Sequence, residues 1–204
     1  MMNDTLVLLI RHGLTPTTGQ VLPGRAPGLH LSEKGQEQAR EVAKRLDPLD
    51  LAAVYVSPLE RTRETAAPTA GLFRLEARVC EPLLECDFGE WTGANLSELS
   101  RLEEWRTVQQ RPSEFRFPGG ESFVEMQERI VCGVRDLAAR HPGETIACFS
   151  HADPIKAALT SFEGLELDRF QSISADPASI SAVRIDASGN AEVLRRNSTS
   201  GDVV

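Results

Sequence analysis

The sequence predicts an α/β protein, a three-layer α/β/α sandwich whose central sheet is mostly parallel. Three observations favour this class: short apolar segments alternate with segments of helical period, several apolar segments end in polar residues or glycine, and the chain closes on a hairpin pattern. At 204 residues a single hydrophobic core suffices. We expect one domain over residues 1–196 and a flexible polar tail over residues 197–204.

Each element of the first half rests on a local pattern. The apolar residues from Leu6 to Ile10 predict a buried strand, and the Gly- and Pro-rich stretch after it predicts a long loop. Ser32 is placed to cap the next helix, and Pro58 suits the first turn of the helix after the second strand. In chain order we expect strand 5–10, loop 13–31, helix 32–46, strand 52–56, helix 59–70 and a weaker strand 75–79.

The second half repeats the alternation. Residues 121–140 form the strongest predicted helix, because apolar side chains recur every three or four positions along one side. A Ser-Gly-Asn turn joins the last two strands into a hairpin. The remaining elements are loop 83–93, irregular helix 95–110, strand 145–149, helix 154–162 and hairpin strands 180–185 and 191–194.

Composition narrows the class of protein. Hydrophobic residues at 41% and charged residues at 25% are ordinary for a globular protein. The net charge of −8 argues against nucleic acid or an anionic membrane as partner, although clustered arginines could still hold a small anion. The N-terminus has neither a signal-peptide nor a membrane-span pattern, and the four cysteines form no CxxC pair, so we expect a cytoplasmic protein with reduced core or partly buried thiols.

Polar side chains follow three predicted buried strands. Arg11 and His12 follow the first, Ser57 and then Arg61 follow the second, and His151 comes after the strand over residues 145–149. Ligands of open α/β sheets bind at the carboxyl ends of strands, so these groups could share one anion-binding pocket. Taken singly, Arg61 could be a solvated helix residue and His151 a satisfied strand-end histidine. Their coincidence at equivalent positions favours a common site.

Five segments extend this pattern: Leu9-Ile-Arg-His-Gly13, Ser57-Pro-Leu-Glu-Arg-Thr-Arg-Glu-Thr-Ala66, Leu84-Glu-Cys-Asp-Phe-Gly-Glu-Trp-Thr-Gly93, Pro118-Gly-Gly-Glu-Ser122 and Phe149-Ser-His151. In this order and spacing they resemble the histidine phosphatase superfamily, in its phosphoglycerate-mutase-like branch. The resemblance covers about three quarters of the chain. It implies a phosphoglycerate-mutase-like fold and a histidine phosphatase-like domain over residues 1–196.

The resemblance also implies roles for particular residues. His12 would be the nucleophile and form a phosphohistidine, while Arg11, Arg61 and His151 would hold the phosphoryl oxygens. Glu85 would protonate the leaving oxygen and then deprotonate the incoming water. Neutral imidazole is the attacking form, and guanidinium groups match phosphate oxygens in pairs.

Some positions depart from the family's pattern or compete for a role. Thr18 stands where many relatives carry a phosphate-contacting asparagine, and its hydroxyl could substitute. Leu14 replaces a frequent glutamate, and Ala152 replaces a frequent glycine beside the phosphate site. The carboxylates competing with Glu85 for the acid/base role are Glu81, Asp87 and Glu90.

The predicted activity is metal-independent hydrolysis of a small phosphomonoester by a histidine acid phosphatase (EC 3.1.3 type), with no cofactor. The competing function is a phosphoglycerate-mutase-type phosphomutase, which the short insert over residues 95–117 disfavours. A non-catalytic phospholigand-binding module is the third possibility, although such relatives usually lose the nucleophile or the acid. The sequence leaves the substrate and the oligomeric state open; relatives often form homodimers.

Several residues receive no catalytic role. We expect His30 and His141 at the surface, and Trp91 and Trp105 in packing, the latter two at the rim of the pocket. Whether the arginines of the insert contact substrate stays open; these are Arg101, Arg106, Arg111 and Arg116.

Overall fold

The computed structural model describes residues 3–204, so the first two residues of the predicted domain lie outside the described residues. One sheet of six strands has the order β3-β2-β4-β1-β5-β6. The β3, β2, β4 and β1 strands are mutually parallel, and β5 is antiparallel to both β1 and β6. The strands are β1 Thr5–Arg11, β2 Leu51–Val56, β3 Ala77–Val79, β4 Thr145–Ser150, β5 Ile180–Ile185 and β6 Ala191–Ser198.

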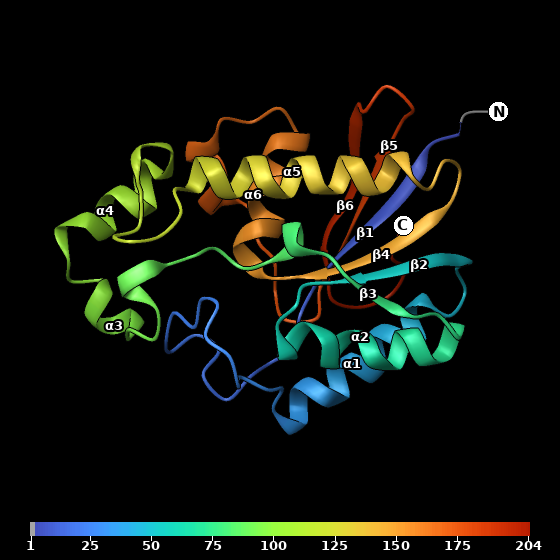
Figure 1. Ribbon diagram of the computed structural model, residues 1–204, viewed down its shortest axis with the longest axis horizontal. Coiled ribbons are helices and arrows are strands. Elements are labelled where there is room, and N and C mark those ends of the chain that lie inside the picture. Colours follow the sequence, from blue (N-terminus) through green and yellow to red (C-terminus); the bar gives the residue numbers. More distant parts are fainter. Residues whose placement is uncertain (1–2) are drawn as a thin grey trace.

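Helices cover both faces of this sheet, which confirms the predicted three-layer α/β/α sandwich. In Figure 1, α1 and α2 lie on one face and α5 and α6 on the other, while α3 and α4 lie away from the sheet. Short 3₁₀ segments occupy Glu81–Leu83, Gly89–Trp91, Pro112–Glu114 and Leu167–Ser172. The helices are α1 Glu33–Leu46, α2 Glu60–Phe73, α3 Leu96–Leu99, α4 Glu103–Gln110, α5 Phe123–Ala139 and α6 Ala152–Phe162.

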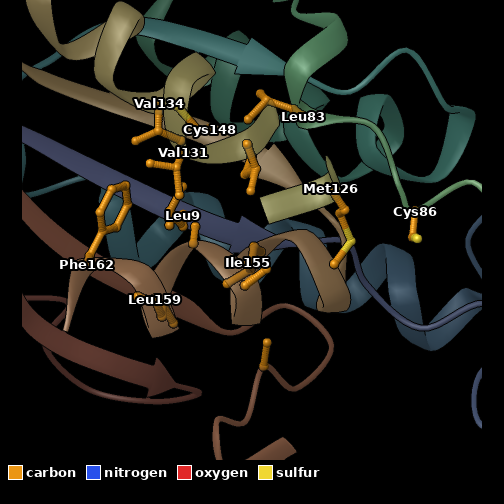
Figure 2. Close-up of a cluster of buried hydrophobic side chains, with 14 of the residues drawn as sticks. Leu9, Leu83, Cys86, Met126, Val131, Val134, Cys148, Ile155, Leu159 and Phe162 are labelled. Atoms are coloured by element: carbon orange, nitrogen blue, oxygen red, sulfur yellow. The ribbon is translucent and has the colours of Figure 1, made fainter. Parts of the chain in front are cut away.

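The sheet separates two apolar clusters. The larger one lies under α5 and α6, where Met126, Val134 and Leu159 meet Leu9 and Cys148 of the central strands (Figure 2). The smaller one joins the other face of the same strands to α1 and α2. Because β1 and β4 are buried on both faces, their sequences are almost continuously apolar, as expected for central parallel strands.

The cap predicted at Ser32 is present, and the helix boundaries shift by a few residues. Pro58 is not in the first turn of α2 as predicted, because Leu59 is the N-cap and the helix begins at Glu60. The Ser32 side chain accepts a hydrogen bond from the backbone N–H of Gly35. Ser122 and Glu125 form a reciprocal capping box at the start of α5. The α6 helix begins at Ala152, two residues earlier than predicted, because Pro154 is tolerated in a first helical turn, where no N–H is needed.

The C-terminal residues differ from the predicted flexible tail. The β6 strand continues to Ser198, and Arg45 of α1 donates hydrogen bonds to the carbonyl oxygens of Ser198 and Gly201. Val203 is buried in the smaller apolar cluster. The tail was predicted to fray because its composition is polar, but one apolar side chain and one arginine fix it against α1.

Two other surface predictions need correction. His141 is buried, where it bonds the Tyr55 hydroxyl at 2.8 Å and the Glu144 carboxylate at 2.6 Å, whereas His30 is exposed as expected. Cys132 is exposed on α5, although the cysteines were predicted in the core or partly buried. Within residues 3–204, no helix combines the length and apolar character needed to cross a bilayer.

Candidate active site

The sheet topology brings the three predicted strand ends together. The β4 strand lies between β1 and β2, and Arg11 of β1 is in register with Ser150 of β4. The ladder continues past the strands, because the His12 N–H donates to the Ser150 carbonyl at 3.1 Å and the Ser57 N–H donates to the Phe149 carbonyl at 3.0 Å. The side chains after these strands therefore start from one edge of the sheet.

His12 is held with one ring nitrogen engaged and the other available. Its Nδ1 lies 2.7 Å from the Gly13 carbonyl oxygen, an arrangement that requires Nδ1 to carry the proton. Burial lowers the pKa of His12 to about 3, and the positive charges of Arg61 and Arg11 add to this effect. The ring is therefore neutral near pH 7, and the Nε2 lone pair is free to act as a nucleophile.

Gly13 is needed for close packing of the backbone that follows β1. A Cβ atom at Gly13 would come within 2.7 Å of the Gly35 carbonyl oxygen, and one at Gly35 within 2.0 Å of the Leu14 carbonyl oxygen. The Gly13 N–H donates to the Thr65 hydroxyl at 3.0 Å. These contacts fix the backbone that carries His12 against α1 and α2.

Arg11 and Arg61 are buried with part of their hydrogen-bonding capacity unused. Arg11 donates to the Ala175 carbonyl at 2.7 Å, and Arg61, which is 0% exposed, donates to the Gly24 carbonyl at 2.8 Å. Within residues 3–204, the Nε of Arg11 and both Nε and Nη1 of Arg61 have no hydrogen-bond partner. Buried donors of this kind are costly unless a ligand satisfies them, so they indicate an anion site.

His151 completes this donor set. Its Nε2 lies 2.8 Å from the Ser57 hydroxyl, while its buried Nδ1 has no hydrogen-bond partner in the described part of the chain. The ring centroid of His151 is 5.3 Å from that of His12. Burial lowers the pKa of His151 well below its ordinary value, and Arg61 contributes to the shift. When Nε2 accepts a hydrogen bond from the Ser57 hydroxyl, the proton of the neutral ring is on Nδ1, which can then donate to a ligand.

Glu85 is a buried carboxyl group beside these cations. Its Oε1 accepts the Cys86 N–H at 2.9 Å, and its Oε2 is 4.0 Å from Nδ1 of His151. Burial, together with the negative charge of Asp153, raises the pKa of Glu85 to about 7 despite the opposing effect of Arg61. A carboxyl group with this pKa can both give and take a proton near neutral pH.

A charged network fixes the loop that carries Glu85. Arg129 of α5 donates to the carbonyl oxygens of Pro82 and Leu84, at 2.8 and 2.9 Å. The Glu121 carboxylate joins Arg129 to Arg25 through contacts of 2.8 Å. Both carbonyl bonds come from Nη1 of Arg129, and its Nη2 donates to the Glu85 carbonyl at 3.3 Å, so the guanidinium fork holds the backbone at and before Glu85.

A cavity of about 260 Å³ opens onto this cluster. Arg11, His12, Thr18, Glu85 and Ala152 are in its wall, while the fully buried Arg61 and His151 are not. The Thr18 hydroxyl bonds the Thr15 hydroxyl at 2.9 Å. Ala152 begins α6, a helix without a side-chain cap, so unpaired N–H groups of its first turn are available there.

All seven predicted site residues thus lie in or directly beside one site. The three carboxylates that compete with Glu85 for the acid/base role lie outside the cavity wall. Glu81 and Glu90 are exposed, and Asp87 accepts a hydrogen bond from the Gly89 N–H. The four insert arginines are absent from the cavity wall too. Trp91 is buried and stacks on Trp105, which lines the cavity, so both packing predictions are confirmed.

Sequence reasoning gave no role to Ser57, Arg129 or Asp153. Ser57 was noticed as a strand-end residue, but nothing in the sequence pairs it with His151. Arg129 lies within a regular helical pattern, and only its tertiary contacts reveal its link to the Glu85 loop. Asp153 follows the second histidine closely, and that proximity was the one signal that could have drawn attention to it.

Comparison with known proteins shows the family of this chain. The sequence model of the histidine phosphatase superfamily (branch 1) matches residues 7–199, and the chain belongs to this family. Phosphoserine phosphatase 1 of Hydrogenobacter thermophilus is 32% identical over 181 residues, covering 86% of this chain and 85% of the relative.

Two solved structures have the same fold. Bacillus stearothermophilus YhfR is 28% identical with a TM-score of 0.87, and 98% of each chain is covered. The phosphoserine phosphatase of Entamoeba histolytica in complex with 3-phosphoglyceric acid is 26% identical with a TM-score of 0.82, covering 95% of this chain and 97% of that one.

Proposed function

We propose that this protein hydrolyses phosphomonoesters in two steps through a phosphohistidine on His12, without a metal ion or cofactor. Membership of the histidine phosphatase superfamily and similarity to a phosphoserine phosphatase support the reaction class. The observation that carries the mechanism is the set of unpartnered buried donors on Arg11, Arg61 and His151 around an imidazole with a free Nε2. Such a set suits the three equatorial oxygens of a transferring phosphoryl group.

In the first step, the Nε2 lone pair of His12 attacks phosphorus and the P–O ester bond breaks. The Glu85 carboxyl proton passes to the departing oxygen, so the product leaves as a neutral alcohol. In the second step, a water oxygen attacks the phosphohistidine while the Glu85 carboxylate takes its proton. The P–N bond breaks, inorganic phosphate is released, and both residues return to their starting states.

The charges of the site suit this sequence. The lowered pKa of His12 keeps the nucleophile unprotonated, and the raised pKa of Glu85 keeps a proton available near pH 7. Burial lowers the pKa of both guanidinium groups, but arginine stays protonated in proteins. The two cations balance the charge that magnesium neutralises in many other phosphoryl-transfer enzymes.

Trapping of the phosphoenzyme tests this mechanism. Acid-labile, alkali-stable label should appear on the protein after mixing with a ³²P-labelled phosphomonoester, and His12→Ala should abolish both label and turnover. His30→Ala is the matched control, because His30 is exposed and lies outside the cavity wall. Turnover by His12→Ala at the wild-type rate would refute the mechanism, and loss of turnover in excess EDTA would refute its metal independence.

A separate assay distinguishes hydrolysis from phosphomutase activity. The protein is incubated with 3-phosphoglycerate, with and without 2,3-bisphosphoglycerate, and both inorganic phosphate and 2-phosphoglycerate are measured. We expect phosphate release to be the main reaction. Isomerisation that exceeds phosphate release would identify a mutase, and tight vanadate binding without turnover of any ester would identify a binding module.

A further inference from the structure

The cavity beyond the phosphate site is mostly apolar. Its wall includes six apolar side chains from five separate segments: Leu22, Phe88, Leu96, Trp105, Val108 and Phe117. Phe88, Val108 and Phe117 are themselves nearly completely buried, and Trp91 stacks behind Trp105 at a centroid distance of 6.3 Å. This packing fixes the wall before any ligand binds.

Beyond the phosphate site, the described residues of this wall include no positively charged side chain that could pair with a second negative group on the substrate, such as a carboxylate. Among residues 3–204, Arg11 of the phosphate site is the sole positively charged side chain that lines the cavity. Outside the phosphate site, the polar residues of the wall, such as Gln109 and Gln171, are uncharged. The one exception among the described residues is the acidic Asp153. A carboxylate carried by a substrate would therefore meet hydrocarbon or another carboxylate, and its desolvation would go uncompensated.

A lysine that contacts this wall already has partners of its own. Lys156 donates to Gln171 at 2.9 Å, lies 3.7 Å from the Asp153 carboxylate and sits over the Phe170 ring at 3.9 Å. Arg25, close to the Glu85 loop, is bound to Glu121 at 2.8 Å. Neither cation can turn to a substrate without giving up these contacts.

We propose that this cavity selects phosphomonoesters of uncharged apolar or aromatic alcohols over esters whose alcohol carries a carboxylate. The proposal rests on the function proposed above and specifies the leaving group that the site accepts. A cavity of about 260 Å³ is small for a ligand site, since such pockets span roughly 300–1,000 Å³. It suits one ring or a short branched chain, with Trp105 as the stacking surface.

Substrate pairs of similar leaving-group basicity test this selectivity. We expect kcat/KM for benzyl phosphate to exceed that for ethyl phosphate by about 10- to 100-fold, since each apolar group that fills such a pocket gains about this factor. Phosphoserine and 3-phosphoglycerate should fall below ethyl phosphate. Benzylphosphonate, which cannot be hydrolysed, should inhibit the wild-type protein more strongly than phosphonoacetate.

Variants of the wall provide a second test. Trp105→Ala should lower kcat/KM for benzyl phosphate by about tenfold and for ethyl phosphate by less than about threefold. Gln109→Lys adds a cation at an exposed position of the wall and should raise kcat/KM for 3-phosphoglycerate. Arg106→Ala is the matched control on the same helix, because Arg106 is exposed and does not line the cavity.

The outcomes separate this inference from the proposed function. Labelled phosphoenzyme combined with a preference for phosphoserine or 3-phosphoglycerate over benzyl phosphate would overturn the selectivity alone. The selectivity would also be overturned if Trp105→Ala lowered kcat/KM equally for benzyl and ethyl phosphate and benzylphosphonate inhibited the wild-type protein more weakly than phosphonoacetate. Absence of labelled protein and of turnover with all four esters would overturn the proposed function itself.

Discussion

Replacing Glu85 by glutamine should lower the activity of the protein and raise its stability. The pKa of the buried carboxyl is about 7 instead of the ordinary 4.5, because burial and Asp153 disfavour the charged form. Each pKa unit corresponds to about 1.4 kcal/mol, so the ionised carboxylate costs the folded state about 3 kcal/mol above pH 7. Glutamine has nearly the same shape and no charge, and its Oε1 can still accept the Cys86 N–H.

The pH dependence of this difference follows from linkage. Below about pH 4.5 the carboxyl is protonated in both folded and unfolded states, so it imposes no cost. Between about pH 4.5 and about pH 7 the carboxyl is ionised in the unfolded state but still protonated in the folded state, so the wild-type protein progressively loses stability relative to the variant. Above about pH 7 the carboxyl is ionised in both states and the difference stays constant. We expect Glu85→Gln to be more stable than wild type by about 3 kcal/mol at about pH 8 and equally stable near pH 4.

Urea unfolding at several pH values measures the stability, and kcat with an alkyl phosphate measures the activity. Loss of the general acid should lower kcat by about 10²- to 10⁴-fold and abolish a decline of the wild-type rate above about pH 7. Glu90→Gln, at an exposed position, should change neither quantity. Equal stability of Glu85→Gln and wild type at pH 8, or an unchanged alkaline decline in rate, would refute the reasoning.

Three further variants test how the site is positioned. Ser57→Ala should lower kcat and vanadate affinity by about tenfold, because the His151 ring loses the hydrogen bond that orients it. Ser57→Thr should restore both quantities. Unchanged vanadate affinity in Ser57→Ala would exclude the positioning role. Arg129→Ala should lower kcat by about 10- to 100-fold. Arg129→Lys should not rescue it, because lysine lacks the fork whose Nη1 and Nη2 hold the Leu84 and Glu85 carbonyl oxygens. Gly35→Ala should destabilise the fold by about 1–3 kcal/mol in thermal or urea unfolding, because its Cβ would collide with the Leu14 backbone. Gly71→Ala is the control and should not destabilise the fold, because the space around Gly71 is open.

The fold could be predicted from the sequence because its signals are local. Central strands buried on both faces require continuous apolar runs, and α5 displays its core face through apolar residues at helical spacing. Predictions failed where long-range contacts override composition. The polar C-terminal residues pack through Val203 and Arg45, and His141 is buried because Tyr55 and Glu144 satisfy both of its ring nitrogens.

The sequence by itself determined which side chains follow the strands, and hence that two arginines and two histidines could meet at one edge of the sheet. Glu85 follows no strand, and only the resemblance to the histidine phosphatase superfamily implied its place in the site. Only the tertiary structure decided the chemical state of these groups. The raised pKa of Glu85 and the unpartnered donors of Arg61 arise from burial and from neighbours far apart in the chain, whereas the free Nε2 of His12 also depends on the Nδ1 bond to the adjacent Gly13 carbonyl. The apolar character of the cavity likewise comes from segments that meet only after folding, because a wall built from loops and short helices has no periodic pattern in the sequence.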